Sequence, residues 1–134
     1  MTKRLALVAI LVPDYDAGID FFVHTLGFDL LQDAPISDTK RWVRVGHAGS
    51  GAEFLLARAV GDQRDFIGKQ GGGRVWLFLE TDNFAQDHAD MTAKGVHFEQ
   101  APRDEPYGTV AVFHDPFGNR WDLIQFAHPD RSHA

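Results

Sequence analysis

Hydrophobic residues along the chain follow the same pattern twice. An apolar run comes first, LALVAILV at residues 5–12 and RVWLFLE at residues 74–80, and its continuity predicts a strand covered on both faces. A polar turn and a helical pattern follow each run, and they predict helices over about 17–26 and 84–94. Alternating segments then predict the remaining strands, over residues 28–32, 41–47, 52–58, 96–100, 109–114 and 120–126.

The two copies keep a nearly constant spacing. Leu56 and Leu123 lie 67 residues apart, and the first copy spans about 5–59 while the second spans about 74–127. A linker over about 60–73 joins them. Each copy predicts a βαβββ module, so the expected fold class is α+β, with two tandem modules in a single domain over residues 1–134. Because the strand faces opposite the helices are also largely apolar, we expect a curled mixed sheet around a cavity.

Composition and charge narrow the class of function. A chain of 134 residues with a net charge of −6 and no basic stripe argues against nucleic-acid binding. The absence of cysteine excludes disulfides, thiolate metal sites and thiol nucleophiles. No apolar run approaches the roughly 20 residues of a membrane span. The basic and apolar start lacks a signal-peptide cleavage site, so we expect a cytoplasmic protein without a membrane partner.

Three segments resemble a known family: VPDYDAGIDFFVHTLGFDLL, RVWLFLETDNF and EPYGTVAVFHDPFGNRWDLIQF. They are similar to the vicinal oxygen chelate superfamily, which contains glyoxalase I, bleomycin-resistance and extradiol-dioxygenase proteins built from paired βαβββ modules. The DPxGNxWDL hairpin and strand is the most specific of these features. The resemblance implies the fold and a homodimer. It leaves the activity open, because this fold carries many chemistries and also plain binding proteins.

The resemblance also implies where a metal would lie. Metal-dependent members place a His on the first strand of each module and a Glu on a last strand, and the divalent ion acts as a Lewis acid on two substrate oxygens. Matched residue by residue, the four positions fall on Leu7, Leu55, Trp76 and Asp122. Only Asp122 offers an oxygen, whereas catalytic metal sites ordinarily use about three protein ligands. We therefore expect no cofactor at the usual position.

An unusual carboxylate site is the alternative. Glu53 shares a strand face with Leu55, and Glu80 shares one with Trp76. Together with Asp122 they would form an all-oxygen set suited to magnesium or calcium. The structural explanation is that Glu53 begins a strand in solvent and that Glu80 caps the turn before the second helix.

Several other side chains have both a functional and a structural interpretation. Asp122, a charge inside an apolar strand, is either an acid–base or substrate-anchoring group or a structural partner of an arginine or a backbone amide. Arg44 is either an anchor for an anionic substrate or part of a solvated strand face. Trp76 and Phe78 either fill the core or line an aromatic slot for a planar ligand. Tyr107 either reaches a cavity or packs beside its turn.

Two functional hypotheses result. The preferred one is a metal-independent protein that binds a small hydrophobic or aromatic molecule in an apolar cavity, with Asp122 as the catalytic candidate if chemistry occurs. The alternative is a lyase, isomerase or dioxygenase that uses a divalent metal ion at the carboxylate site. The expected substrate-binding residues are Leu7, Arg44, Leu55, Trp76, Phe78, Tyr107 and Asp122.

Overall fold

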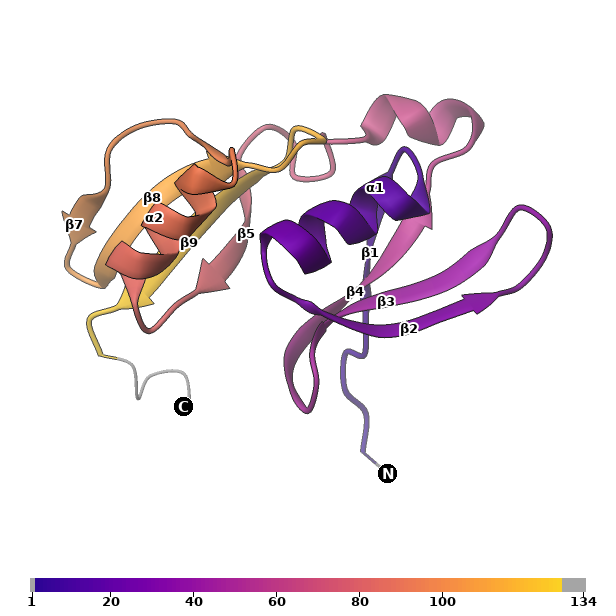
Figure 1. Ribbon diagram of the computed structural model, residues 1–134, viewed down its shortest axis with the longest axis horizontal. Helices are drawn as coiled ribbons and strands as arrows, with labels where there is room; N and C mark the ends of the chain where they lie inside the picture. The colour runs from indigo at the N-terminus through magenta and orange to yellow at the C-terminus, as the bar shows by residue number, and fades with distance from the viewer. Residues whose placement is uncertain (1, 129–134) are drawn as a thin grey trace. The chain divides into compact units, whose positions relative to one another are not determined.

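The computed structural model describes residues 2–128 and divides the chain into two compact units, Met1–Ile67 and Gly68–Ala134. Each unit has one sheet with a helical segment on one of its faces (Figure 1). This arrangement confirms the predicted α+β class and its repeated modules. The predicted linker over 60–73 is divided between the units. No helix among residues 2–128 is both long enough and apolar enough to cross a membrane.

The first unit contains a four-stranded sheet in the order β1-β4-β3-β2. Its strands are β1 (Val8–Val12), β2 (Asp29–Pro35), β3 (Arg41–His47) and β4 (Ser50–Arg58). β1 runs parallel to β4, and the other pairs are antiparallel. The helical segment contacts three of these strands. The sheet face toward it supplies the fully buried side chains of Ile10, Val12, Val43, Val45 and Leu56.

The helical segment of this unit is irregular. The carboxylate of Asp14 caps α1 (Tyr15–Ile19) by accepting a 2.7 Å hydrogen bond from the Ala17 amide. A π-helix, η1 (Asp20–Thr25), then replaces the regular helix predicted over 17–26. In it the Leu26 amide donates to the Phe21 carbonyl, five residues back, at 2.9 Å. Phe21 and Phe22 are the buried residues of this π-helix, whereas Val23 is only partly buried.

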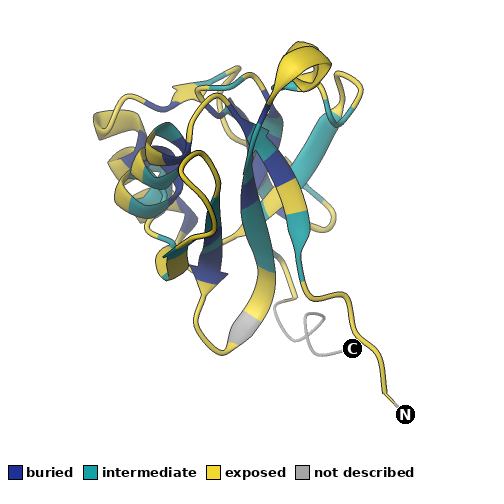
Figure 2. Cartoon of the chain, turned by 90° about the vertical axis from the view of Figure 1, so that its right-hand side faces the viewer, coloured by how far each residue is buried: buried dark blue, intermediate teal, exposed yellow. Residues whose placement is uncertain are grey.

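A short 3₁₀ helix, η2 (Gly61–Phe66), follows β4 and ends just before the first unit does. It lies within the linker predicted over about 60–73. Figure 2 shows the contrast between exposed connections of this kind and the buried stretches of the strands.

The second unit contains a five-stranded sheet with a path β5-β9-β8-β6, and β7 also pairs with β8. Its helix α2 (Phe84–Ala93) begins after Asn83, whose side chain accepts a hydrogen bond from the Gln86 amide. On the sheet face toward α2 lie buried side chains that include Phe113, Trp121 and Leu123. The strands are β5 (Val75–Glu80), β6 (His97–Phe98), β7 (Arg103–Glu105), β8 (Gly108–His114) and β9 (Arg120–Phe126).

Two strands of this sheet differ from their predictions. β6 is only two residues long, whereas a strand over 96–100 was expected. β7 was not predicted, because its sequence, Arg-Asp-Glu, has no apolar residue to signal a buried face. It is held by backbone pairing with β8 on an exposed edge, where Arg103 lies across from Val110.

Candidate functional site

The strand ladders of the two units match position by position. On the sheet face opposite the helix, Leu55 of β4 pairs with Ala9 of β1, and Asp122 of β9 pairs with Phe78 of β5. We call this the helix-free face of each unit. The pairing supports the equivalence of Leu55 and Asp122 that the spacing of 67 residues indicates. The same ladders place Arg44 beside Leu55.

Arg44 is held by other side chains on the helix-free face of the first unit. Its Nε and Nη2 donate to Oε1 of Glu53 at 3.0 and 2.7 Å, and its Nη1 donates to Gln32 at 3.2 Å. Both members of the ion pair are partly buried. The structure therefore brings Arg44 and Glu53, two candidate site residues, together as partners of each other. Leu7 lies just before β1, half-buried.

Asp122 lies on the helix-free face of the second unit and is only 6% exposed. Its ladder neighbours are Phe78 on β5 and Val112 on β8. Its Oδ1 is buried and has no hydrogen-bond partner among residues 2–128. Burial raises the pKa of this carboxyl, although the guanidinium groups of Arg103 and Arg120 act in the opposite direction. This carboxylate is therefore a buried acid whose neutral form is favoured by its surroundings.

The other predicted residues of the second unit lie near β5. Phe78 is beside Asp122 and is 62% exposed, which is unusual for a phenylalanine in a strand. Glu80 is exposed and pairs with Ile124, two positions further along the ladder. Trp76 lies where the register between β5 and β9 shifts. The side chain of Trp76 packs on Gly71, since a Cβ on that glycine would lie 2.5 Å from the Trp76 Cβ.

Tyr107 occupies the turn between β7 and β8 and is 40% exposed. Its carbonyl accepts a 2.9 Å hydrogen bond from the Ala127 amide, which joins the turn to the end of β9. Arg103, at the start of the same hairpin, pairs with Glu105 at 2.8 Å. The hairpin thereby places a guanidinium on the Asp122 side of the sheet, a contribution that the sequence prediction missed because β7 has no apolar pattern.

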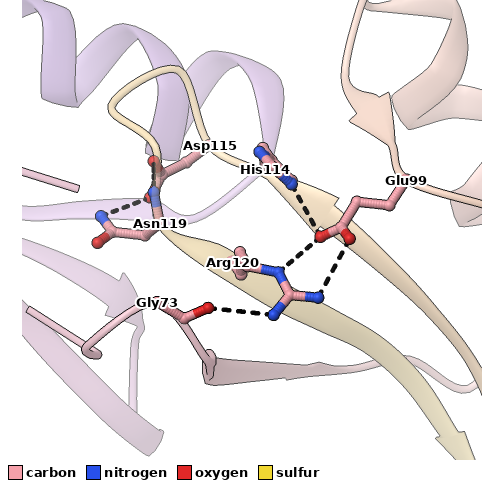
Figure 3. Close-up of polar contacts among 6 residues, drawn as sticks. All are labelled: Gly73, Glu99, His114, Asp115, Asn119 and Arg120. Atoms are coloured by element: carbon pink, nitrogen blue, oxygen red, sulfur yellow. Dashed lines mark hydrogen bonds and ion pairs between the residues drawn. The ribbon is translucent and has the colours of Figure 1, made fainter. Parts of the chain in front are cut away.

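A second charged group surrounds Glu99, which follows β6 (Figure 3). Its carboxylate accepts from Nε and Nη2 of Arg120 at 2.7 and 3.1 Å and lies 2.8 Å from Nε2 of His114. Arg120 also donates to the Gly73 carbonyl at 3.2 Å. Arg120, foremost, and His114 hold the pKa of Glu99 below its usual range. This network occupies Arg120, so Asp122 does not receive a direct hydrogen bond from it.

The most specific sequence motif, DPFGN, has a structural role. Asp115 is buried and accepts hydrogen bonds from the amides of Phe117 and Asn119, each at 3.0 Å. It also accepts from the Asn119 side chain at 2.9 Å, drawn in Figure 3, and from the Trp121 indole at 3.0 Å. The motif therefore fixes the β8–β9 turn.

The side chains at the four metal positions do not fit a tightly bound divalent ion. Leu7, Leu55 and Trp76 offer no donor atoms, and Asp122 offers one carboxylate. Glu53 already accepts two hydrogen bonds from Arg44. In the part of the chain that the structure describes, no three His, Asp or Glu side chains are placed to hold a metal ion together. The donor atoms at these four positions thus give no basis for a reaction step through a metal.

One pocket of about 370 Å³ lies within the first unit, at the ends of β3 and β4. Trp42 and Leu55 line it, and Lys40, Arg41 and Arg58 are also at its wall. Of these residues only Leu55 was among the predicted site residues. The antiparallel pairing of β3 with β4 brings the other residues together, because it places the start of the first strand beside the end of the second.

Comparison with known proteins gives the family. Residues 4–123 match the Glyoxalase/Bleomycin resistance protein/Dioxygenase superfamily. An uncharacterized protein of Shewanella frigidimarina (strain NCIMB 400) is 49% identical over 128 residues, which cover 93% of this chain and 95% of the relative.

Two solved structures share the fold over nearly their whole length. UcmS2 has a TM-score of 0.77 and 31% identity, covering 92% of this chain and 98% of its own. TnmS3, an antibiotic binding protein from Streptomyces sp. CB03234, has a TM-score of 0.75 and 31% identity, covering 94% and 98%. With the superfamily match over residues 4–123, these likenesses show that the chain belongs to the glyoxalase/bleomycin resistance protein/dioxygenase superfamily.

Proposed function

We propose that this protein binds a small hydrophobic or aromatic molecule without a metal ion at the position used by metal-dependent relatives. The observation that carries the proposal is the presence of Leu7, Leu55 and Trp76 at three of the four metal positions. Apolar side chains there favour apolar ligands, at about 25 cal/mol per Å² of apolar surface removed from water. The likeness to TnmS3, an antibiotic binding protein, supports ligand binding on this fold.

In this proposal Asp122 is the polar anchor of the second unit. Its buried Oδ1 lacks a partner among the described residues, and leaving such an atom unsatisfied costs about 1–3 kcal/mol. A hydroxyl or amide donor on the ligand would remove that cost. Phe78 beside it presents an exposed ring on which an aromatic ligand can stack. The fitting ligand therefore combines an aromatic surface with a hydrogen-bond donor.

Metal analysis and ligand screening test the proposal together. The protein is purified without a histidine tag, its bound metal is measured by mass spectrometry, and nickel, zinc, manganese and magnesium are titrated by calorimetry. Thermal-shift screening against aromatic drugs and metabolites should give stabilising compounds whose effect falls in Asp122→Ala. The control is Asp82→Ala, which removes an exposed carboxylate of the same unit.

The outcomes separate the two classes of function. Stabilising compounds without stoichiometric metal support the binding protein. Stoichiometric metal that is lost in Asp122→Ala would overturn it, in favour of a metal-dependent lyase, isomerase or dioxygenase with Glu53, Glu80 and Asp122 as ligands. A screen without any stabilising compound would also count against binding.

The proposal includes a cytoplasmic homodimer, and the dimer rests on the resemblance to the family. Light scattering coupled to size-exclusion chromatography measures the assembly directly. A mass near twice the 15.0 kDa of the chain supports the dimer, and a mass near 15.0 kDa contradicts it.

A further inference from the structure

The pocket of the first unit combines an apolar wall with unusual charge. Its volume of about 370 Å³ falls in the range of small-molecule sites, which runs from about 300 to 1,000 Å³. Trp42, Leu55 and Ala57 come from the helix-free faces of β3 and β4, whereas Leu56 and Arg58 come from the face toward the helix, so the pocket lies around the ends of these strands and takes side chains from both faces. Among the described residues that line it, none is acidic. Three are basic, namely Lys40, Arg41 and Arg58.

Two of these three cations form no ion pair with any residue in the described stretch 2–128. Arg41 forms ion pairs with Asp16 at 2.9 Å and with Asp33 at 2.7 Å, and its guanidinium lies 5.2 Å from the ring centre of Tyr15. The side chains of Lys40 and Arg58, by contrast, have no partner within residues 2–128. In a chain with a net charge of −6, two unpaired cations at one pocket indicate a preference for negative ligands.

The backbone holds both cations in place. The β2–β3 connection is closed by hydrogen bonds from the Ile36 and Ser37 amides to the Lys40 carbonyl, at 2.8 and 3.1 Å, and Ser37 Oγ accepts from the Lys40 amide at 3.2 Å. Arg58 is the last residue of β4 and pairs with Val12 of β1. Little backbone entropy is therefore lost when a ligand meets these residues.

Leu55 strengthens the preference for an anion. Its equivalent in the second unit is Asp122, a carboxylate. A carboxylate at position 55 would place a negative charge in the wall of the pocket and repel an acidic ligand. Leucine removes that charge and adds apolar surface beside Trp42.

We infer that this pocket takes the acidic end of an aromatic ligand, with a carboxylate, sulfonate or phosphate group beside Lys40 and Arg58 and the ring against Trp42 and Leu55. The inference rests on the proposed function, because it names the class of ligand. Arg58 can donate two parallel hydrogen bonds to such a group, whereas Lys40 contributes a point charge. The indole of Trp42 provides the stacking surface.

A matched pair of fluorescent dyes tests it. 1-Anilinonaphthalene-8-sulfonate and N-phenyl-1-naphthylamine share one aromatic skeleton, and only the first carries an acidic group. Wild-type protein should bind the sulfonate about 10-fold more tightly than the neutral amine, since partly exposed charge pairs contribute modestly to affinity. Raising the ionic strength should reduce that ratio.

Variants locate the effect. Lys40→Gln with Arg58→Gln should abolish the 10-fold preference and leave binding of the neutral dye unchanged. The control, Lys69→Gln with Arg74→Gln, removes the same charges from exposed positions in the other unit and should keep the preference. Trp42→Leu should weaken both dyes. Circular dichroism confirms that each variant is folded.

The inference and the function it rests on fail in different ways. Equal affinity of the wild-type protein for the two dyes, or a preference that survives Lys40→Gln with Arg58→Gln, overturns the acidic-ligand inference and leaves the binding function standing. Failure of both dyes to bind, together with an empty thermal-shift screen, overturns both.

Discussion

The helix-free faces of the two units have matching strand pairings, but their charged side chains lie at different positions. In the first unit, Leu55 is flanked by Arg44, whose charge is met by Glu53. In the second, the equivalent Asp122 is flanked by Val112 and retains a buried oxygen without a partner among residues 2–128. The repeat therefore determines where a side chain lies in the sheet. The residue type at each of two equivalent positions then determines whether that position is apolar, ion-paired or acidic.

The largest expected effect concerns the buried leucines that the two units have at equivalent positions. Leu56 and Leu123 are 1% and 0% exposed and occupy equivalent places on the faces toward the helices. Leu56→Ala and Leu123→Ala should each lower the free energy of unfolding by about 3 kcal/mol, through lost burial and the cavity left behind. Urea denaturation measures both. A loss of less than about 1 kcal/mol in the free energy of unfolding at only one of the two positions would show that the two leucines are not packed equally well.

The next effect concerns the acid of the second unit. Asp122→Leu, which gives the second unit the residue of the first, should raise the free energy of unfolding at pH 8 by about 2 kcal/mol, because a buried unsatisfied group is removed. The pKa of Asp122 is raised in the folded state, so its charge destabilises the protein only as the pH climbs from the ordinary value of 3.8 through the raised pKa.

The gap between Asp122→Leu and the wild type should therefore widen as the pH rises through that window. Denaturation at pH 3 and at pH 8 compares the two states of the carboxyl. A gap of the same size at both values would contradict the assignment. Asp122→Asn keeps the side-chain shape and separates the effect of charge from that of packing.

A smaller effect concerns the ion pair of the first unit. A double-mutant cycle of Arg44→Gln and Glu53→Gln should give a coupling energy of about 1 kcal/mol, because the pair is partly buried and joined by two hydrogen bonds. The coupling should decrease in 1 M salt. Chemical denaturation of the four proteins gives the value. A coupling near zero would mean that the pair does not distinguish this face energetically.

The smallest effect concerns Glu99. Arg120 and His114 hold its folded-state pKa below the ordinary value of 4.5, so the stabilisation it provides is present above that pH and is lost as the pH falls through the lowered pKa. Glu99→Gln should cost about 0.5 kcal/mol at pH 7, since the group is near the surface. Thermal melts at pH 7 and pH 3 test this expectation. An unchanged cost at pH 3 would rule it out.

Much of the strand pattern was predictable because local signals and tertiary structure agree. Residues 41–47 and 120–126 form strands with the predicted bounds, since alternating side chains and a tight turn specify both. The π-helix was not predictable, because the apolar residues of this segment also fit the period of a regular helix. β7 was missed because pairing with β8, and no apolar pattern, holds it there.

The candidate site was predictable in position but not in pairing. The repeat spacing indicated Leu55 and Asp122 as equivalent, and the ladders agree. The sequence could not indicate that Arg44 is paired with Glu53 while Lys40 and Arg58 have no partner in the described stretch, because pairing depends on side-chain geometry across strands. The charge of the first-unit pocket consequently emerged only from the structure.

Gly68 has a consequence for recombining this protein with its relatives. It has a φ of +75°, and a Cβ there would collide with the Phe117 carbonyl and lie 3.0 Å from the Gly118 Cα, so its backbone lies against the β8–β9 turn. Gly68, which lies in the connection between the two modules, therefore belongs structurally to the second module. A chimera that exchanges the second module should be cut between Ile67 and Gly68, so that the glycine travels with the hairpin it supports; a cut after residue 73 would separate them.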